Sequence, residues 1–158
     1  MIRWKQQGDT KGIVELVRKQ LVPLSPWQHP RDARLRLEVV RRLRRGPTFV
    51  ASRTRQSSPF GFVHLEVRGS VLFVDLLAVD SRHQNRQWGT ELMRRAESYG
   101  RKKGCTVAYL FVDEGNARGI RFYRRLGYQS LSYIDELKAY HMHKSLVSVD
   151  NPFGNALR

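Results

Sequence analysis

One stretch of the sequence restricts the fold more than any other. It begins with Val71–Val79, which is apolar except at Asp75, and continues through a polar loop to a helix-like segment starting near Trp88. A short, almost unbroken apolar run is typical of a strand covered on both faces. The segment 88–103 carries apolar residues at helical spacing, namely Leu92, Met93, Ala96 and Tyr99. Gly104 follows where a helix end favours a positive φ. This order predicts a buried strand, a loop and a helix in direct succession.

The rest of the chain shows the same two periodicities. Strands are expected at 2–4, 48–53, 61–68, 107–112 and within 128–145, and helices at about 9–20, 31–45 and 117–126. Asp9 or Thr10 is the expected cap of the first helix, and Pro23, Pro26 and Pro30 interrupt the chain after it. This order predicts an α+β fold, an α/β sandwich whose mixed, mostly antiparallel central sheet carries helices on both faces.

Length and composition suit a single domain. The 158 residues, 41% of them apolar, can bury a core without a disulfide or metal; residues 1–146 are the expected domain and 147–158 a loose tail. The single cysteine, Cys105, excludes an intramolecular disulfide and a cysteine-based zinc site, and no metal is expected. No charge-free apolar run approaches the roughly 18 residues that span a membrane, and the first residues lack the apolar core of a signal peptide. A cytoplasmic protein without membrane contact is therefore expected.

The charge of the chain is unusually positive. There are 29 Lys and Arg against 14 Asp and Glu, a net charge of +15. Such a field attracts nucleic acid, acidic surfaces or phosphorylated cofactors. It exceeds what one cofactor needs and leaves room for a polyanionic partner. The arginine run at Arg41, Arg42, Arg44 and Arg45 is a candidate contact, although a solvated helix face is the commoner meaning of such a run.

The loop at 84–90 combines features of an anion site. Unpaired N–H groups at a helix start, together with the positive end of the helix dipole, bind anions. Gly89 has no Cβ and lets the backbone come close to a phosphate. Arg82, His83 and Arg86 add positive charge around the loop. Taken alone, the loop is equally consistent with an ordinary turn from strand to helix.

Read with its neighbours, this loop resembles the cofactor motif of the GNAT superfamily of N-acetyltransferases. That motif is Gln or Arg, two residues, Gly, one residue, then Gly or Ala; Gln84 and Gly89 hold its first and last places, and Gln87 replaces the inner glycine. The resemblance implies acetyl-CoA as co-substrate. The cofactor-binding residues that it implies are Leu77, Ala78, Val79, Gln84, Asn85, Arg86, Gln87, Trp88, Gly89, Thr90 and Asn116.

A second match to the same family starts 27 residues after Gly89. It resembles the family's asparagine, two residues, alanine, an aromatic–tyrosine pair and a final glycine–aromatic pair. Here these places are taken by Asn116, Gly119, Phe122–Tyr123 and Gly127–Tyr128. Because Asn116 and Tyr123 are seven positions apart, about two helical turns, they share one helix face. Together the two matches cover about residues 71–128.

The resemblance also implies roles for these residues. Asn116 would bond the pantetheine arm or order the site, and Tyr123 would donate a proton to the departing thiolate. From the residues alone, Asn116 is equally a helix N-cap, and Tyr123 a core aromatic. Family chemistry further implies that backbone groups near Leu77 and Val79 pair with pantetheine and polarise the thioester carbonyl. The strand there would then be splayed from its neighbour at 108–112.

The acceptor amine must lose a proton before it attacks, since a lysine-like amine has a pKa of about 10.4. Asp75 is the first candidate base, because it lies inside an apolar strand and in phase with Leu77 and Val79, hence on the same face. Glu66 on the preceding strand is the second candidate. A structural ion pair explains either carboxylate as well. His141 and His143 are interpreted as a surface pair, since no third metal ligand is near.

These observations predict direct transfer of an acetyl group from acetyl-CoA to a primary amine of a small molecule or protein. The alternative is a GNAT-fold module that binds acyl-CoA or nucleic acid without catalysis, which Gln87 and the net charge support. Polyamines, amino acids, aminoglycosides, protein N-termini and lysines all fit as acceptors, and the protein is expected to be a monomer or homodimer.

Overall fold

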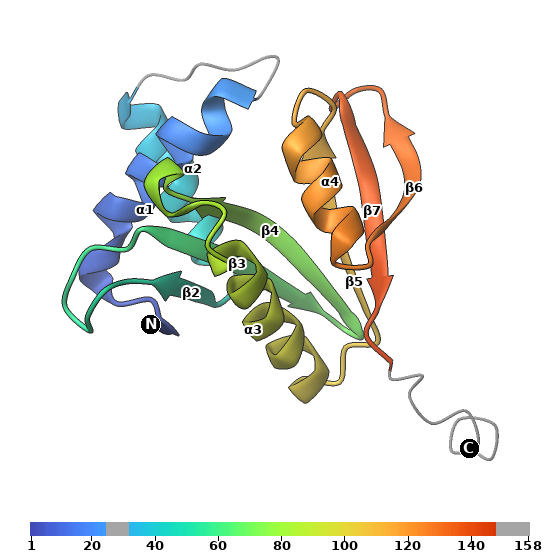
Figure 1. The fold of residues 1–158 in the computed structure, drawn as a ribbon, viewed down its shortest axis with the longest axis horizontal. Helices are drawn as coiled ribbons and strands as arrows, with labels where there is room; N and C mark the ends of the chain where they lie inside the picture. The colour runs from blue at the N-terminus through green and yellow to red at the C-terminus, as the bar shows by residue number, and fades with distance from the viewer. Residues whose placement is uncertain (25–31, 148–158) are drawn as a thin grey trace.

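The computed structural model describes residues 1–24 and 32–147 and contains one seven-stranded sheet (Figure 1). The strand order is β1-β2-β3-β4-β5-β7-β6, and only the β4–β5 pair is parallel. The strands are β1 (Ile2–Trp4), β2 (Thr48–Ala51), β3 (Gly61–Arg68), β4 (Val71–Val79), β5 (Val107–Asp113), β6 (Gln129–Ile134) and β7 (Ala139–Ser145). The predicted mixed, mostly antiparallel sheet is confirmed.

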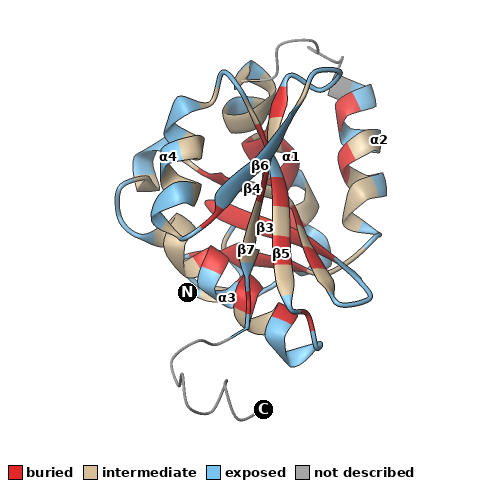
Figure 2. Ribbon diagram, turned by 90° about the vertical axis from the view of Figure 1, so that its right-hand side faces the viewer, coloured by how far each residue is buried: buried red, intermediate tan, exposed pale blue. Residues whose placement is uncertain are grey.

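Helices cover both faces of the sheet. They are α1 (Thr10–Leu16), α2 (Asp32–Leu43), α3 (Trp88–Lys102) and α4 (Ala117–Arg125), with short helical turns η1 (Gln7–Asp9), η2 (Val17–Leu21), η3 (Val22–Leu24) and η4 (Ser81–His83). One apolar cluster joins α1 and α2 to the sheet through Phe62 and Ala78, and a larger one packs α3 through Leu92 and Met93. Figure 2 shows these buried residues on the central strands and on the helix sides that face them. The central strands β3 and β4 therefore have one face toward α2 and the other toward α3.

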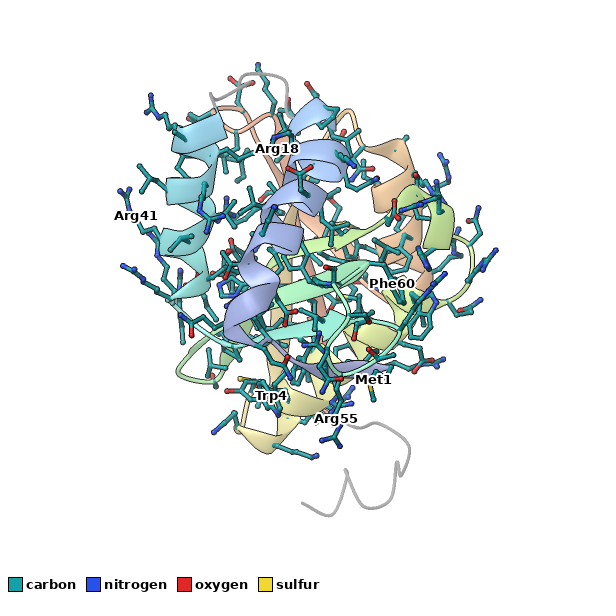
Figure 3. The ribbon with its side chains drawn as sticks, turned by 90° about the vertical axis from the view of Figure 1, so that its left-hand side faces the viewer. Met1, Trp4, Arg18, Arg41, Arg55 and Phe60 are labelled. Atoms are coloured by element: carbon teal, nitrogen blue, oxygen red, sulfur yellow. The ribbon has the colours of Figure 1, made fainter. Side chains whose placement is uncertain are left out.

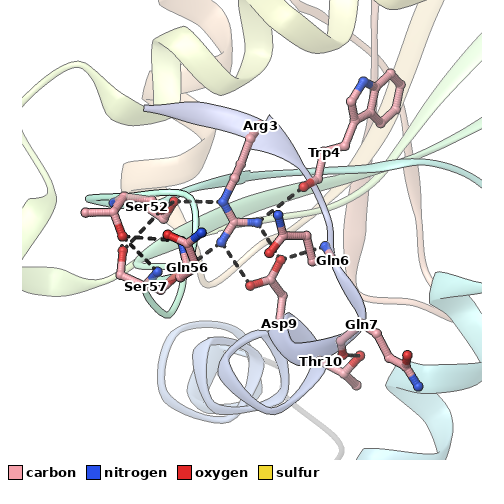
Figure 4. A network of polar contacts seen from close by, with 10 residues as sticks. Arg3, Trp4, Gln6, Gln7, Asp9, Thr10, Ser52, Gln56 and Ser57 are labelled. Carbon is pink, nitrogen blue, oxygen red and sulfur yellow. Dashed lines mark hydrogen bonds and ion pairs between the residues drawn. The ribbon is translucent and has the colours of Figure 1, made fainter.

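The start of the chain differs from the prediction that Asp9 or Thr10 caps the first helix. The side chain of Asp9 makes no cap to α1; instead its carboxylate accepts from the Arg3 guanidinium at 2.7 Å and from the Gln6 N–H at 2.7 Å. Arg3 also donates to Ser52 and to the carbonyl of Ser57 (Figure 4). A buried ion pair is thus made where a helix cap was expected, and it ties β1 to the start of α1.

The arginine run on α2 is not uniform. Arg41, Arg44 and Arg45 are exposed, and Arg41 points away from the sheet (Figure 3). Arg42 instead turns toward the sheet and binds Asp75. A polyanion contact through the exposed arginines stays a prediction. The expected turns at Pro26 and Pro30, and the tail beyond Val147, lie outside the described residues. Within the described part of the chain, no helix is long and apolar enough to cross a membrane.

Gly46, between α2 and β2, lies against the backbone of β3. A Cβ there would be 2.0 Å from the Leu65 carbonyl oxygen, and the next residue, Pro47, accepts the Leu65 N–H at 2.9 Å. Gly46→Ala should therefore lower the free energy of unfolding by about 2 kcal/mol or more, measured by urea denaturation. Gly8→Ala is the matched control, since its Cβ would meet nothing within 4 Å. Equal effects of both changes would contradict the close approach at Gly46.

Candidate active site

A cavity of about 670 Å³ lies between the end of β4, the starts of α3 and α4, and the η2–η3 segment. The predicted residues that line it are Leu77, Ala78, Val79, Gln84, Asn85, Gln87, Trp88, Gly89, Thr90, Asn116 and Tyr123. Arg86 is exposed and lies outside the lining. Glu66 and Asp75 also lie outside the lining, but their side chains are buried on the α2 face. The two motifs, distant in sequence, thus meet around one cavity.

The loop before α3 has a left-handed backbone at two places. Gln87, at the N-cap of α3, has φ 69°, and Asn85 has φ 63°. Gln87 thus adopts the conformation that a glycine at this place would take with little strain. The side chain of the N-cap residue, Gln87, makes no cap to α3, so the first N–H groups of the helix remain able to bind an anion. The replacement of the inner glycine therefore changes the side chain and the strain, and the loop keeps its shape.

Gln87→Gly tests that conclusion. Relief of the left-handed strain outweighs the added entropy of the unfolded chain, so the free energy of unfolding should rise by up to about 1 kcal/mol. Removing the side chain from the cavity lining should also lower the Kd for acetyl-CoA. Chemical denaturation and calorimetric titration measure the two effects. Arg86→Gly, at a neighbouring position without a positive φ, should destabilise slightly; if both variants behave alike, Gln87 is not strained.

Gly89 serves packing between helices. A Cβ on Gly89 would lie 3.2 Å from Cζ of Phe122, so the missing side chain lets α4 approach the start of α3. Phe122 also lines the cavity. The sequence indicated only a close approach to phosphate at this position. The structure adds that Gly89 sets how closely the two motif helices lie.

The opposite wall was not predicted from the sequence. It consists of Lys19, Gln20, Leu21, Pro23 and Leu24, from the η2–η3 segment. Here the first helix continues as a π-helical turn, Val17–Leu21. Such turns are rare in proteins as a whole, and those that occur are often found at functional sites. In the sequence, Ile13, Val17 and Leu21 follow one another at helical spacing, and this is the only signal that the helix extends to the wall.

Gln84 links this wall to the motif loop. Its Nε2 donates to the Val79 carbonyl at 2.8 Å and to Oε1 of Gln20 at 3.2 Å. The side chain therefore holds the end of β4, the loop and η2 together. This contact assigns Gln84 a bracing role at the cavity edge, in addition to its place in the lining.

The cavity is electropositive. Its lining includes Lys19, His83, Arg118 and Arg125 and, among the described residues, no carboxylate. Arg118 donates to Oδ1 of Asn85 at 2.9 Å, which places its guanidinium beside the motif loop. His83 stacks on Phe60 with ring centroids 4.0 Å apart. Positive side chains next to an uncapped helix start suit a ligand with several phosphate charges.

At the other end of the cavity the sheet opens. β4 and β5 pair only at Val71↔Val107, Leu72↔Ala108 and Phe73↔Tyr109. Beyond these pairs the two strands diverge, as Figure 1 shows. The cavity is lined by Leu77, Ala78 and Val79, which belong to the diverging part of β4. The splay expected from the resemblance is therefore present, and it leaves one edge of β4 free to pair with a ligand.

Tyr123 lies in the cavity wall. Its ring is half-buried, 5.2 Å from Phe122 and 5.9 Å from Tyr128 by centroid. Burial raises the pKa of Tyr123 above its usual value, so the phenol keeps its proton across the physiological range. Tyr123 can therefore supply a proton, while a phenolate here would be costly.

Asn116 is the N-cap of α4. Its Oδ1 accepts the Gly119 N–H at 2.9 Å. A Cβ on Gly119 would lie 2.4 Å from Nδ2 of Asn116, so only a glycine leaves room for this arrangement. Gly119, which stands where the family has alanine, thus leaves space for the Asn116 side chain to lie against the first turn of α4.

Comparisons with known proteins agree with this geometry. The profile of the Acetyltransferase (GNAT) family matches residues 11–128. The chain belongs to this family. The GNAT fold is shared with Ard1 from Thermoplasma volcanium (TM-score 0.75, 23% identity, covering 94% of this chain and 98% of that one). The same fold is found in the PaiA N-acetyltransferase of Thermoplasma acidophilum in complex with coenzyme A (TM-score 0.74, 20% identity, covering 92% of this chain and 98% of that one).

A third similar structure is the ribosomal-protein-S18-alanine N-acetyltransferase of Escherichia coli, with a TM-score of 0.70 and 16% identity over 96% of this chain and 97% of that one. At these identities the likeness is one of fold. No curated protein sequence matches the chain.

In this GNAT chain the candidate base lies on the other face of β4. The register passes from His64↔Leu76 to Leu65↔Val74, so Asp75 is an extra residue in a β-bulge. Asp75 therefore faces α2, where Arg42 binds both its oxygens at 2.5 and 3.1 Å. Leu77 packs in the α3-side core. The prediction that Asp75 shares a face with Leu77 and Val79 is wrong, because the regular alternation of side chains between the two faces of a strand is interrupted at a bulge.

Glu66 also lies on the α2 face. It is buried, and its Oε1 accepts from Arg68 at 2.7 Å. In the structure both carboxylates, Glu66 and Asp75, are therefore members of ion pairs, as the structural interpretation of the sequence expects. Their side chains are only 7% and 4% exposed, for Glu66 and Asp75 respectively, so each would be costly without its arginine.

Gly119→Ala should displace the Asn116 side chain from the helix start. Loss of that cap should lower the free energy of unfolding by about 1 kcal/mol. Asn116→Ala should cost a similar amount, and the double variant no more than either single one, because both remove the same contact. Thermal denaturation of the four proteins gives the coupling. Additive losses would show that Gly119 and Asn116 act independently.

Proposed function

We propose that this GNAT protein is an N-acetyltransferase that transfers the acetyl group of acetyl-CoA directly to a primary amine of a small molecule or protein. One observation carries the proposal. A single cavity joins an uncapped, cation-rimmed helix start to the splayed edge of β4, and Tyr123 lies in its wall. Phosphate binding and acyl transfer thus find suitable groups in one continuous space.

At the phosphate end, the first turn of α3 would hold the pyrophosphate. The N–H groups there have no capping side chain, and Lys19 and Arg118 flank them from opposite walls. At the other end, backbone groups on the free edge of β4 near Leu77 and Val79 would pair with the pantetheine amides. A backbone N–H there would polarise the thioester carbonyl, which acetyl-CoA supplies.

Tyr123 would complete the transfer. As the C–S bond breaks, its phenol donates a proton to the departing sulfur. A phenol with a raised pKa is a weak acid in water, but a thiolate beside it in the cavity is also less well solvated than in bulk water, so the pKa of the thiol rises too. Asp75 is the proposed carboxylate on the acceptor side, across the splay.

The names of the similar structures support this reading. One was solved with coenzyme A, and another acts on an alanine of a ribosomal protein, as its name states. For this chain both the acyl-CoA and the acceptor are proposals.

Calorimetric titration with acetyl-CoA, followed by thiol release against an amine panel, tests the proposed function. The panel should include polyamines, amino acids, aminoglycosides, and peptides with free N-termini or lysines. We expect saturable binding and thiol release with at least one class. Absence of acetyl-CoA binding would refute the cofactor assignment itself.

A further inference from the structure

A compact polar cluster lies on the α2 face of the sheet, at the bulge in β4. His64 and Glu66 from β3 and Asp75 from β4 each offer a ligand atom, and these atoms lie within 4.8 Å of one another. His64 is fully buried, and its Nε2 has no hydrogen-bond partner among the described residues. Buried polar atoms are rarely left unpaired, so this nitrogen indicates a missing partner.

The orientation of His64 is defined by its other nitrogen. Nδ1 lies 2.9 Å from Oγ1 of Thr48, while Nε2 lies 3.7 Å from Oδ2 of Asp75, too far for a hydrogen bond. With the proton on Nδ1, no donor among the described residues reaches the Nε2 lone pair, whereas Arg42 donates to both oxygens of Asp75 and Arg68 donates to Oε1 of Glu66. A group with several N–H donors could donate to Nε2 and to the remaining acceptor positions of the carboxylates.

Charge favours a monovalent occupant. Arg42 already pairs with Asp75, and Arg68 with Glu66, so the two carboxylates are balanced. Burial lowers the pKa of His64, with Asp75 opposing the shift, so the ring is neutral near pH 7. A divalent metal would leave two uncompensated charges in this buried place. A primary ammonium brings a single positive charge, and it loses that charge when it gives up a proton.

The cluster is placed to serve the transfer reaction. Asp75 lies two residues before Leu77, which lines the cavity from the opposite face of β4. The gap between β4 and β5 begins just beyond Phe73. An amine bound on the α2 face would therefore be next to the opening that leads to the cavity.

Two partly exposed arginine side chains, those of Arg42 and Arg68, cover the cluster. The side chains of Arg42 and Arg68 are 42% and 58% exposed and lie between the carboxylates and solvent, so an incoming ammonium would take over their bonds to the carboxylates. The Arg68 guanidinium lies 5.4 Å from the ring centre of Phe73, which itself stacks on Tyr109. This part of the α2 face thus already holds one cation against an aromatic ring and a carboxylate.

We propose that the acceptor's ammonium binds among His64, Glu66 and Asp75, and that Nε2 of His64 takes its first proton. The step rests on the proposed function. One N–H bond of the ammonium breaks and an Nε2–H bond forms, which leaves a neutral amine and an imidazolium beside Asp75. The amine nitrogen then bonds to the thioester carbon. Its second proton leaves to solvent as the C–S bond breaks and Tyr123 protonates the sulfur. Solvent then returns a proton to Tyr123, and the His64 imidazolium releases its proton to solvent before the next turnover.

The pH dependence of kcat/KM gives the first test, with whichever panel amine is turned over. His64 faces Asp75 on β4, Glu66 on β3, Arg42 on α2 and the neutral Thr48 on β2. We expect His64→Asn to lower kcat/KM at pH 7 at least 30-fold and to move the acidic limb of the profile to higher pH. His141→Asn, which removes another buried unpartnered Nε2 from outside the cluster, should change neither. An unshifted limb in folded His64→Asn would overturn the proposal.

A binding readout separates this inference from the proposed function. In wild-type protein labelled with ¹⁵N-histidine, methylammonium should shift the His64 Nε2 resonance, and tetramethylammonium, which has no N–H donor, should not. Equal or absent shifts would overturn the ammonium site, as would tight Zn²⁺ binding that His64→Asn abolishes. A selective shift without turnover of any amine would leave the site standing and refute the transferase.

Discussion

Tyr123→Phe is expected to lower kcat about 100-fold and to leave the Kd for acetyl-CoA unchanged, because the ring keeps its packing and loses only the hydroxyl group that donates the proton. The phenol lies in the cavity wall and stays protonated, so it can serve as the proton donor for the leaving sulfur. Steady-state thiol release and calorimetric titration measure the two quantities. With the phenol absent, the leaving thiolate must take its proton from water.

Tyr133→Phe is the matched control for this change. Tyr133 is exposed on β6, where its hydroxyl donates to Glu114, and it is outside the cavity lining. Its loss should leave both kcat and Kd unaffected. Full turnover by Tyr123→Phe at saturating substrates would remove the general-acid assignment.

Reversal of charge at Lys19 and Arg118 is expected to raise the Kd for acetyl-CoA about 100-fold, roughly 2.7 kcal/mol. Lys19 comes from η2 and Arg118 from α4, so the pair brackets the α3 start from both sides. The double variant Lys19→Glu/Arg118→Glu replaces two attractions by two repulsions. Titration at two salt concentrations should show a weaker salt dependence than in wild type.

The double variant Arg121→Glu/Arg124→Glu changes net charge equally and serves as the control. Both arginines are exposed on α4 and outside the cavity lining. A loss of affinity as large as that of the first pair would mean that the overall positive field, and no particular site, attracts the ligand.

The sequence predicted the framework of the site because that framework depends on local patterns. The apolar run of β4 and the helical spacing of Leu92 and Met93 identify the strand and helix around the loop. The seven-residue spacing of Asn116 and Tyr123 places both in one cavity wall. These features need no knowledge of distant contacts.

The side of β4 that carries Asp75 could not be predicted in the same way. A bulge adds one residue to one strand and has no composition of its own, so only the register with β3 reveals it. The η2 wall was missed for a related reason, since a π-helical turn uses the same residues as an α-helix. The bracing contacts of Gln84 join segments 64 positions apart in the chain.

Quantification of thiol and product in one reaction tests the central claim most directly. Protein, acetyl-CoA and an accepted amine are mixed, and free thiol, acetylated amine and intact protein mass are measured together. Direct transfer predicts one acetylated amine for each thiol released, with the protein mass unchanged and both products formed about 100-fold more slowly by Tyr123→Phe. Binding of acetyl-CoA without product on any amine, or acetyl retained on the protein, would contradict it.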